Sequence, residues 1–140
     1  MCGLDRLTVV GMIMFGALAG CGDSSTPARE AGSSGCATGY AGCSSFQDGT
    51  TGSQTITFGT AGNTYQPSCL KVKVGQQVTF SGTFSVHPLT QACGPAQVIT
   101  NGSGTSTTFT FATAGLYGYY CAVHGFANGN GMAGSIQVVP

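Results

Sequence analysis

The sequence has no tryptophan, only two histidines and very little charge, with four basic and four acidic residues among 140. Binding of nucleic acid needs clustered lysine and arginine, so no nucleic-acid partner is predicted. The same scarcity of charge predicts weak long-range steering toward a charged partner. No stretch keeps a helical period of apolar residues over about eleven positions, which argues against a helical fold.

Glycine, by contrast, is abundant at 24 residues, together with many threonine, valine, phenylalanine and tyrosine residues. This mixture favours short strands joined by turns. Apolar and polar residues alternate in several segments, most clearly at residues 70–74, where two lysines separate Leu70, Val72 and Val74. Similar segments occur at residues 54–58, 78–80, 107–111, 117–121 and 135–139. Six or more short strands with turn signals between them predict an all-β sandwich or barrel.

The N-terminus is predicted to be a targeting segment. Arg6 precedes an apolar run at residues 7–19, which is too short to span a bilayer and fits the core of a signal peptide. The run ends in Leu18-Ala19-Gly20-Cys21, which resembles a bacterial lipobox. That resemblance implies a signal peptide at 1–20, a lipid on Cys21 and an exported protein, periplasmic or at the cell surface, anchored to a bacterial membrane. The alternative is an ordinary signal peptide with a chance cysteine at its end.

The rest of the chain divides into two parts by composition. Residues 21–53 are rich in glycine, serine and threonine with almost no apolar periodicity, which predicts a flexible tether. The strand-like alternation begins at Gln54, so residues 54–140 are predicted to be the folded domain. A domain of this size has a small core, and disulfides and a metal ion are expected to stabilise it.

The cysteines support an unpaired thiol in that domain. Seven cysteines less Cys2 and Cys21 leave five, an odd number, in a compartment that permits disulfides. Four are therefore expected to pair and one to stay reduced, and Cys121 is the predicted free thiol. Of the three pairings that Cys36, Cys43, Cys69 and Cys93 allow, we favour Cys69–Cys93 and Cys36–Cys43, the second as a small knot within the tether.

A candidate metal site is formed by the free cysteine and three other residues. His124 follows Cys121 closely, Met132 lies at the far end of the next loop, and His87 is the other histidine of the chain. The remaining methionines all lie in the predicted targeting segment. A trigonal set of one cysteine and two histidines with a weak axial methionine is the geometry of type 1 copper sites. Singly, each residue has a plainer interpretation: a loop histidine, a core methionine or a zinc ligand.

In order along the chain, residues 54–140 resemble the cupredoxin family and its plastocyanin-like domains. The resemblance is carried by Tyr65-Gln66-Pro67, Val72-Lys73-Val74-Gly75, His87, Tyr119-Tyr120-Cys121-Ala122-Val123-His124 and Gly131-Met132-Ala133-Gly134. It implies a Greek-key β-sandwich or barrel of the cupredoxin type with about six to eight strands. It also implies one copper ion held by His87, Cys121, His124 and Met132, with His87 on a separate strand. The seven residues between His124 and Met132 make a longer loop than is usual in plastocyanins.

The function that the resemblance implies is one-electron transfer, and no enzymatic activity is predicted. Redox proteins are the expected partners, and the chain is expected to be a monomer. His124 is expected to pass the electron through an apolar surface patch that includes Leu89 and Phe126. The alternative from another class is a copper carrier or buffer that delivers or sequesters the metal outside the cytoplasm. A stapled structural sandwich with a fortuitous thiol is a third interpretation.

Overall fold

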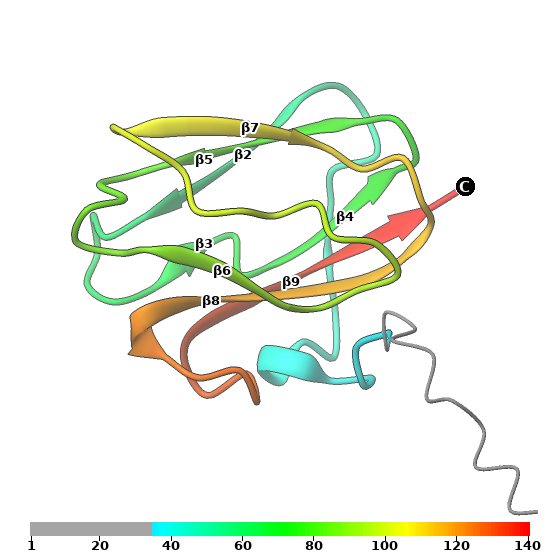
Figure 1. Cartoon of the computed structure of the whole chain (residues 1–140). Helices are drawn as coiled ribbons and strands as arrows, with labels where there is room; N and C mark the ends of the chain where they lie inside the picture. The colour runs from blue at the N-terminus through cyan, green and yellow to red at the C-terminus, as the bar shows by residue number, and fades with distance from the viewer. Residues whose placement is uncertain (1–34) are drawn as a thin grey trace, which may run out of the picture. The chain divides into compact units, whose positions relative to one another are not determined.

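The computed structural model describes residues 35–140, and the predicted signal peptide and lipidation site Cys21 lie outside that range. These residues form nine strands, one short 3-10 helix and two sheets. Sheet A has the order β1-β4-β9-β8-β6 and sheet B the order β3-β2-β5-β7, and Figure 1 shows β8 and β9 in one layer with β5 and β7 in the other. The elements are η1 (Tyr40–Gly42), β1 (Gln47–Asp48), β2 (Gln54–Phe58), β3 (Tyr65–Gln66), β4 (Cys69–Lys73), β5 (Gln77–Ser81), β6 (Leu89–Cys93), β7 (Ser106–Thr110), β8 (Gly115–Gly125) and β9 (Gly131–Val139).

The predicted all-β sandwich is confirmed, with more strands than the six to eight expected. The strands found from alternation are present, and β4 buries Leu70 and Val72 while Lys73 is exposed. The strands that sequence reasoning missed are β1, β3 and β6. Two of them contain only two residues, and β6 follows no alternating burial pattern. Within residues 35–140 there is no helix of the length and apolarity needed to cross a membrane.

Aromatic rings fill the space between the two sheets. Tyr119 of β8 packs edge-on against Tyr65 and Phe80, with ring centroids 4.9 and 5.0 Å apart. Edge-to-face pairs of this kind contribute about 1 kcal/mol each beyond the area they bury. The hydroxyl groups of Tyr65 and Tyr119 are buried without a hydrogen-bond partner, and burial raises the pKa of both phenols. Both rings therefore act as large neutral core groups.

The disulfides differ from the predicted pairing. Cys36 is bonded to Cys93 and Cys43 to Cys69, so the predicted Cys69–Cys93 and Cys36–Cys43 pairs are wrong. A short local knot between Cys36 and Cys43 was favoured because the segment was taken for a free tether. The structure instead attaches each of these cysteines to a different strand of sheet A.

The described part of the predicted tether, residues 35–53, belongs to the folded domain. In addition to the two disulfides, β1 pairs in parallel with β4, and the Gly49 N–H donates to the Lys71 carbonyl oxygen at 2.8 Å. The predicted domain start at Gln54 is therefore too late. Composition alone could not show this, because two disulfides, one strand pair and the single buried ring of Tyr40, rather than an alternating apolar face, hold the segment.

Candidate metal centre

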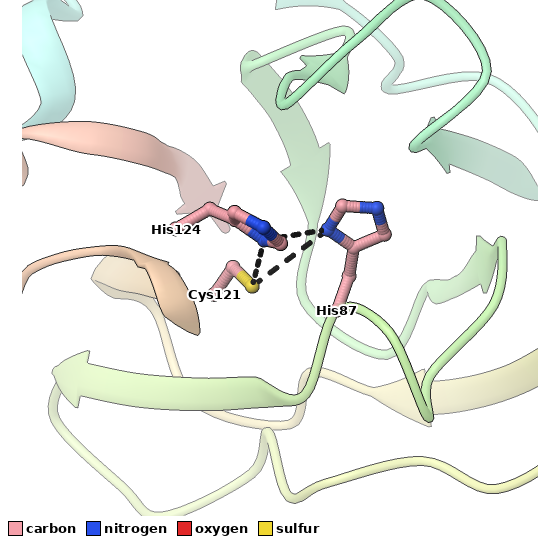
Figure 2. Close-up of side chains that lie close together, drawn as sticks. All are labelled: His87, Cys121 and His124. Atoms are coloured by element: carbon pink, nitrogen blue, oxygen red, sulfur yellow. Dashed lines mark hydrogen bonds between the residues drawn. The ribbon is translucent and has the colours of Figure 1, made fainter.

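Three predicted ligands lie together at one end of the sandwich. His87 Nδ1 is 3.1 Å from His124 Nδ1, and Cys121 Sγ lies 3.5 Å from His124 Nδ1 and 3.9 Å from His87 Nδ1. Figure 2 shows the three side chains directed toward one another, with His87 on one side and the other two opposite. One donor atom of each residue lies within 4.8 Å of the other two. Two imidazole nitrogens and a sulfur at this separation can bind one metal ion.

His87 is held by a turn and not by a strand, which corrects the prediction. Its backbone N–H donates to the Thr83 carbonyl oxygen at 3.0 Å, and β6 begins two residues later. Leu89, the first residue of β6, pairs in register with Cys121 of β8. The Ala122 N–H also donates to the Pro88 carbonyl oxygen at 2.8 Å. These contacts bring two segments distant in sequence to one site.

A large bulge in the β8–β9 hairpin holds the other predicted ligands. Tyr120 pairs with Ala133 and the next pair is Gly125 with Gly131, so residues 121–124 of β8 face Met132 alone in β9. Bulges bend a strand and redirect its side chains, and they are common beside functional sites. Here the bulge contains Cys121, His124 and Met132. The seven-residue spacing seen in the sequence therefore becomes a five-residue loop, residues 126–130, closed by a glycine pair.

Glycines leave room for the site because side chains there would collide with it. A Cβ added at Gly59, which has φ +74°, would lie 2.9 Å from Nε2 and Cδ2 of His87. One added at Gly125 would collide with the Met132 carbonyl oxygen, and one at Gly131 would lie 2.5 Å from the His124 carbonyl oxygen. Such close approaches of the backbone are tolerated only by glycine.

The site is shielded from solvent on most sides. Cys121 is fully buried, Met132 is 1% exposed and His87 is 7% exposed, whereas His124 is only half-buried. Burial, and to a lesser degree the neighbouring His124, lowers the pKa of His87, which favours the neutral imidazole that binds metals. Cys121 is the one cysteine of residues 35–140 outside a disulfide, as the parity of the cysteines predicted.

The predicted surface patch is only partly present. Phe126 is 65% exposed, but Leu89 is 1% exposed and belongs to the core, so its assignment to the patch is wrong. Sequence reasoning did not identify two further exposed apolar residues, Val123 and Val86. They are 64% and 53% exposed and directly precede His124 and His87 in the chain. Position beside the two histidines was the signal that could have found them.

No protein-family model matches the chain, and no curated protein matches it. Among solved structures, the chain is similar to a reduced amicyanin variant at TM-score 0.47 and 25% identity, covering 63% of this chain and 83% of that one. A pseudoazurin from Methylobacterium extorquens AM1 gives TM-score 0.47, 21% identity and coverages of 61% and 74%. A mutant fern plastocyanin gives TM-score 0.45, 22% identity and coverages of 61% and 99%.

These likenesses are distant. The two-sheet fold and the His–Cys–His cluster are consistent with a cupredoxin-like type 1 copper domain.

Proposed function

We propose that the protein is a one-electron carrier with a single type 1 copper site, in which His87, Cys121, His124 and Met132 would hold the ion. The observation that carries this proposal is the convergence of two Nδ1 atoms and one thiol sulfur within 4.8 Å at a bulge that also contains a buried methionine. Bound copper would supply the change between the +1 and +2 states. A thiolate and two imidazoles bind both Cu(I) and Cu(II) more favourably than they bind hard cations such as Mg²⁺ or Ca²⁺.

Burial of the donor atoms favours electron transfer over copper delivery. A carrier must release its ion to another protein, and exposed sulfur and nitrogen donors make that exchange easier. In this structure Cys121 and Met132 are inside the core, and Met132 is the only methionine of residues 35–140. The donors of Cys121 and His124 in β8 and of His87 in the turn before β6 are held close together, so little rearrangement is needed when the charge of the site changes.

His124 is the proposed exit point for the electron because it is the most exposed of the three clustered residues. Val123 and Phe126 present apolar surface on either side of it in the chain. A redox protein with an apolar docking face is therefore the proposed partner. The few charges of the chain predict that docking depends little on ionic strength.

Export and membrane anchoring belong to the same proposal. The two disulfides support an oxidising compartment, since such bonds are rare in the cytosol of most organisms. Lipidation of Cys21 would hold this domain at a bacterial membrane, and a monomer is the proposed state.

The test is the visible and EPR spectrum of the Cu(II)-loaded protein with both disulfides intact, compared with Cys121→Ser. An intense visible band from thiolate-to-copper charge transfer with narrow copper hyperfine splitting, both lost in the variant, is the expected result. A colourless tetragonal Cu(II) signal, or binding of Cu(I) with no stable Cu(II) form, would contradict electron transfer and favour copper carriage. Selective binding of Zn²⁺ without colour would contradict both.

A further inference from the structure

We propose that the N-terminal strap, defined as residues 36–43, positions the loop of the metal centre, and that Tyr40 is the positioning residue. The strap precedes every part of the chain predicted to contact the site, and it was expected to be tether. This inference rests on the proposed copper function for its spectroscopic consequences, but its mechanical part can be measured in the metal-free protein.

The strap is attached at both ends to strands that flank the β8–β9 hairpin. Cys36 is bonded to Cys93 at the end of β6, and Cys43 is bonded to Cys69 at the start of β4. Because sheet A has the order β1-β4-β9-β8-β6, those two strands lie on opposite sides of β9 and β8. The strap therefore runs across the hairpin, and Figure 1 shows the cyan turn η1 beside the orange loop that joins β8 to β9.

Tyr40 and Ala41 contact that hairpin at two places, each a glycine. A Cβ added at Gly129 in the loop would lie 2.6 Å from the Ala41 backbone nitrogen and 3.4 Å from Cδ2 of Tyr40. One added at Gly118 of β8 would lie 2.7 Å from Cε1 of Tyr40 and 2.7 Å from Cys93 Sγ. The Tyr40 ring thus packs against β8 three residues before Cys121 and against the loop five residues after His124.

The loop needs this support because its own bonds are few. Residues 126–130 contain two asparagines and one glycine and are mostly exposed. Their hydrogen bonds are short-range, from Phe126 N–H to the Asn130 carbonyl, from Gly129 N–H to the Phe126 carbonyl and from Asn130 N–H to Asn128 Oδ1. His124 and Met132 lie just outside the two ends of this loop. Contact with the strap therefore limits how far those two residues can move relative to each other.

The role of the Tyr40 ring can be separated from that of its hydroxyl. The hydroxyl is buried without a hydrogen-bond partner, and burial, with a smaller contribution from Tyr120, raises the pKa of this phenol to about 12. Removing an unpartnered hydroxyl costs little, whereas removing the ring leaves the loop unsupported. Tyr40→Phe is therefore the matched control for Tyr40→Ala.

The first measurement is hydrogen exchange of the Phe126 and Gly129 amides in the metal-free protein. In Tyr40→Ala these amides should exchange about tenfold faster than in the parent, while the exchange of the β5 amides is unchanged. The reason is that the loop opens locally more often without the whole domain unfolding. Tyr40→Phe should match the parent. Equal acceleration at all amides of Tyr40→Ala would show a general loss of stability and would overturn the positioning role.

The second measurement is the reduction potential and EPR spectrum of the copper-loaded variants. A loosened loop lets the site relax toward the geometry that Cu(II) prefers, so Tyr40→Ala should widen the hyperfine splitting and lower the potential. The expected size is about a threefold change in the ratio of Cu(II) to Cu(I) affinity, or ~30 mV at 59 mV per tenfold for one electron. An unchanged potential and spectrum in Tyr40→Ala, with a coloured parent protein, would overturn this inference and leave the proposed function intact. A colourless parent would count against the proposed function alone.

Gly129→Ala approaches the same contact from the loop and covers the case in which Tyr40→Ala fails to fold. Its matched control is Gly75→Ala in the β4–β5 turn, where φ is +85° against +88° at Gly129 but the added Cβ meets no atom within 4 Å. Both variants carry the same backbone strain. Only Gly129→Ala should alter the copper spectrum. An equal spectrum in the two variants would contradict the strap contact.

Discussion

Sheet A contains nearly twice as many strand residues as sheet B, and the two sheets carry different parts of the chemistry. Sheet A contains Cys121, His124 and Met132, its strand β6 follows His87, and it bears a partner cysteine of each disulfide. Sheet B approaches the site next to β2, where Gly59 lies against His87 and the Phe58 ring packs edge-on at 6.1 Å, and just after β5, where the Thr83 carbonyl accepts from the His87 N–H. The two sheets are joined by a common aromatic core.

The two sheets also differ in the regularity of their strand pairing. In sheet B, β5 and β7 pair over five consecutive residues without a shift. In sheet A the register shifts both between β6 and β8 and between β8 and β9. Regular pairing buries apolar area efficiently, whereas a bulge leaves backbone free to aim side chains. Sheet B therefore mainly supports the fold, whereas sheet A carries the bulge that contains most of the site.

Replacing a ligand in His87→Ala should have the largest effect on the site. The visible band should disappear, and addition of copper should no longer raise the unfolding temperature as it does in the parent protein, because an ion stabilises only the state that binds it. Absorption spectroscopy and thermal unfolding with and without copper measure both effects. A variant that remains coloured would show that the Nδ1 of His87 is not a ligand.

Phe109→Ala in sheet B should show the reverse pattern. The ring is 9% exposed on edge strand β7 and packs against Phe80, so its loss should lower the free energy of unfolding by about 3 kcal/mol. Denaturant unfolding measures that loss. The spectrum of the folded, copper-loaded variant should match the parent, and a changed spectrum would mean that sheet B also shapes the site.

Gly59→Ala should fall between these two, since it lies where sheet B reaches the site. The added Cβ would push the His87 ring, so the visible band should shift and copper affinity should fall by about tenfold. Gly62→Ala is the control, because its φ is +91° and its surroundings are open. Both variants should lose about 1 kcal/mol from backbone strain. Equal spectra in the two would remove Gly59 from the site.

Thr79→Ala should have the smallest effect. Its hydroxyl pairs with that of Thr108 at 2.8 Å on the exposed face of sheet B. Cross-strand pairs of this kind contribute about 0.5 kcal/mol. Unfolding should shift by about that amount, and the copper spectrum should not change at all. A spectral change here would undermine the division of roles between the sheets.

Several features of the fold could be predicted from the sequence. Strand β2 occupies the residues expected from the alternation of Ile56 and Phe58. The odd number of cysteines predicted one free thiol, and the ligand motif around Cys121 indicated which one. Both features can be read from the sequence without knowing the fold: the strand from a period of two residues, and the free thiol from an odd number of cysteines. The convergence of His87, Cys121 and His124 was expected from their order along the chain and the resemblance that it carries.

Apart from the turn at His87, the predictions that were wrong concerned distant contacts. Leu89 is predicted to lie in the apolar surface patch, yet its pairing with Cys121 puts it in the core. Residues 36–43 are predicted to be tether because their glycine, alanine and threonine residues give no apolar period. Their place in the fold depends on which cysteines meet across about 26 to 57 residues of chain.

The all-β class, one unpaired thiol and the clustered residues His87, Cys121 and His124 could be predicted from the chain alone, because they follow from periodicity, cysteine parity and motif order. Only the tertiary structure decided the disulfide partners, the bulge around Cys121 and His124, and the position of Tyr40 against the loop. Each of these depends on strand register and sheet order, which bring together residues that no local pattern relates.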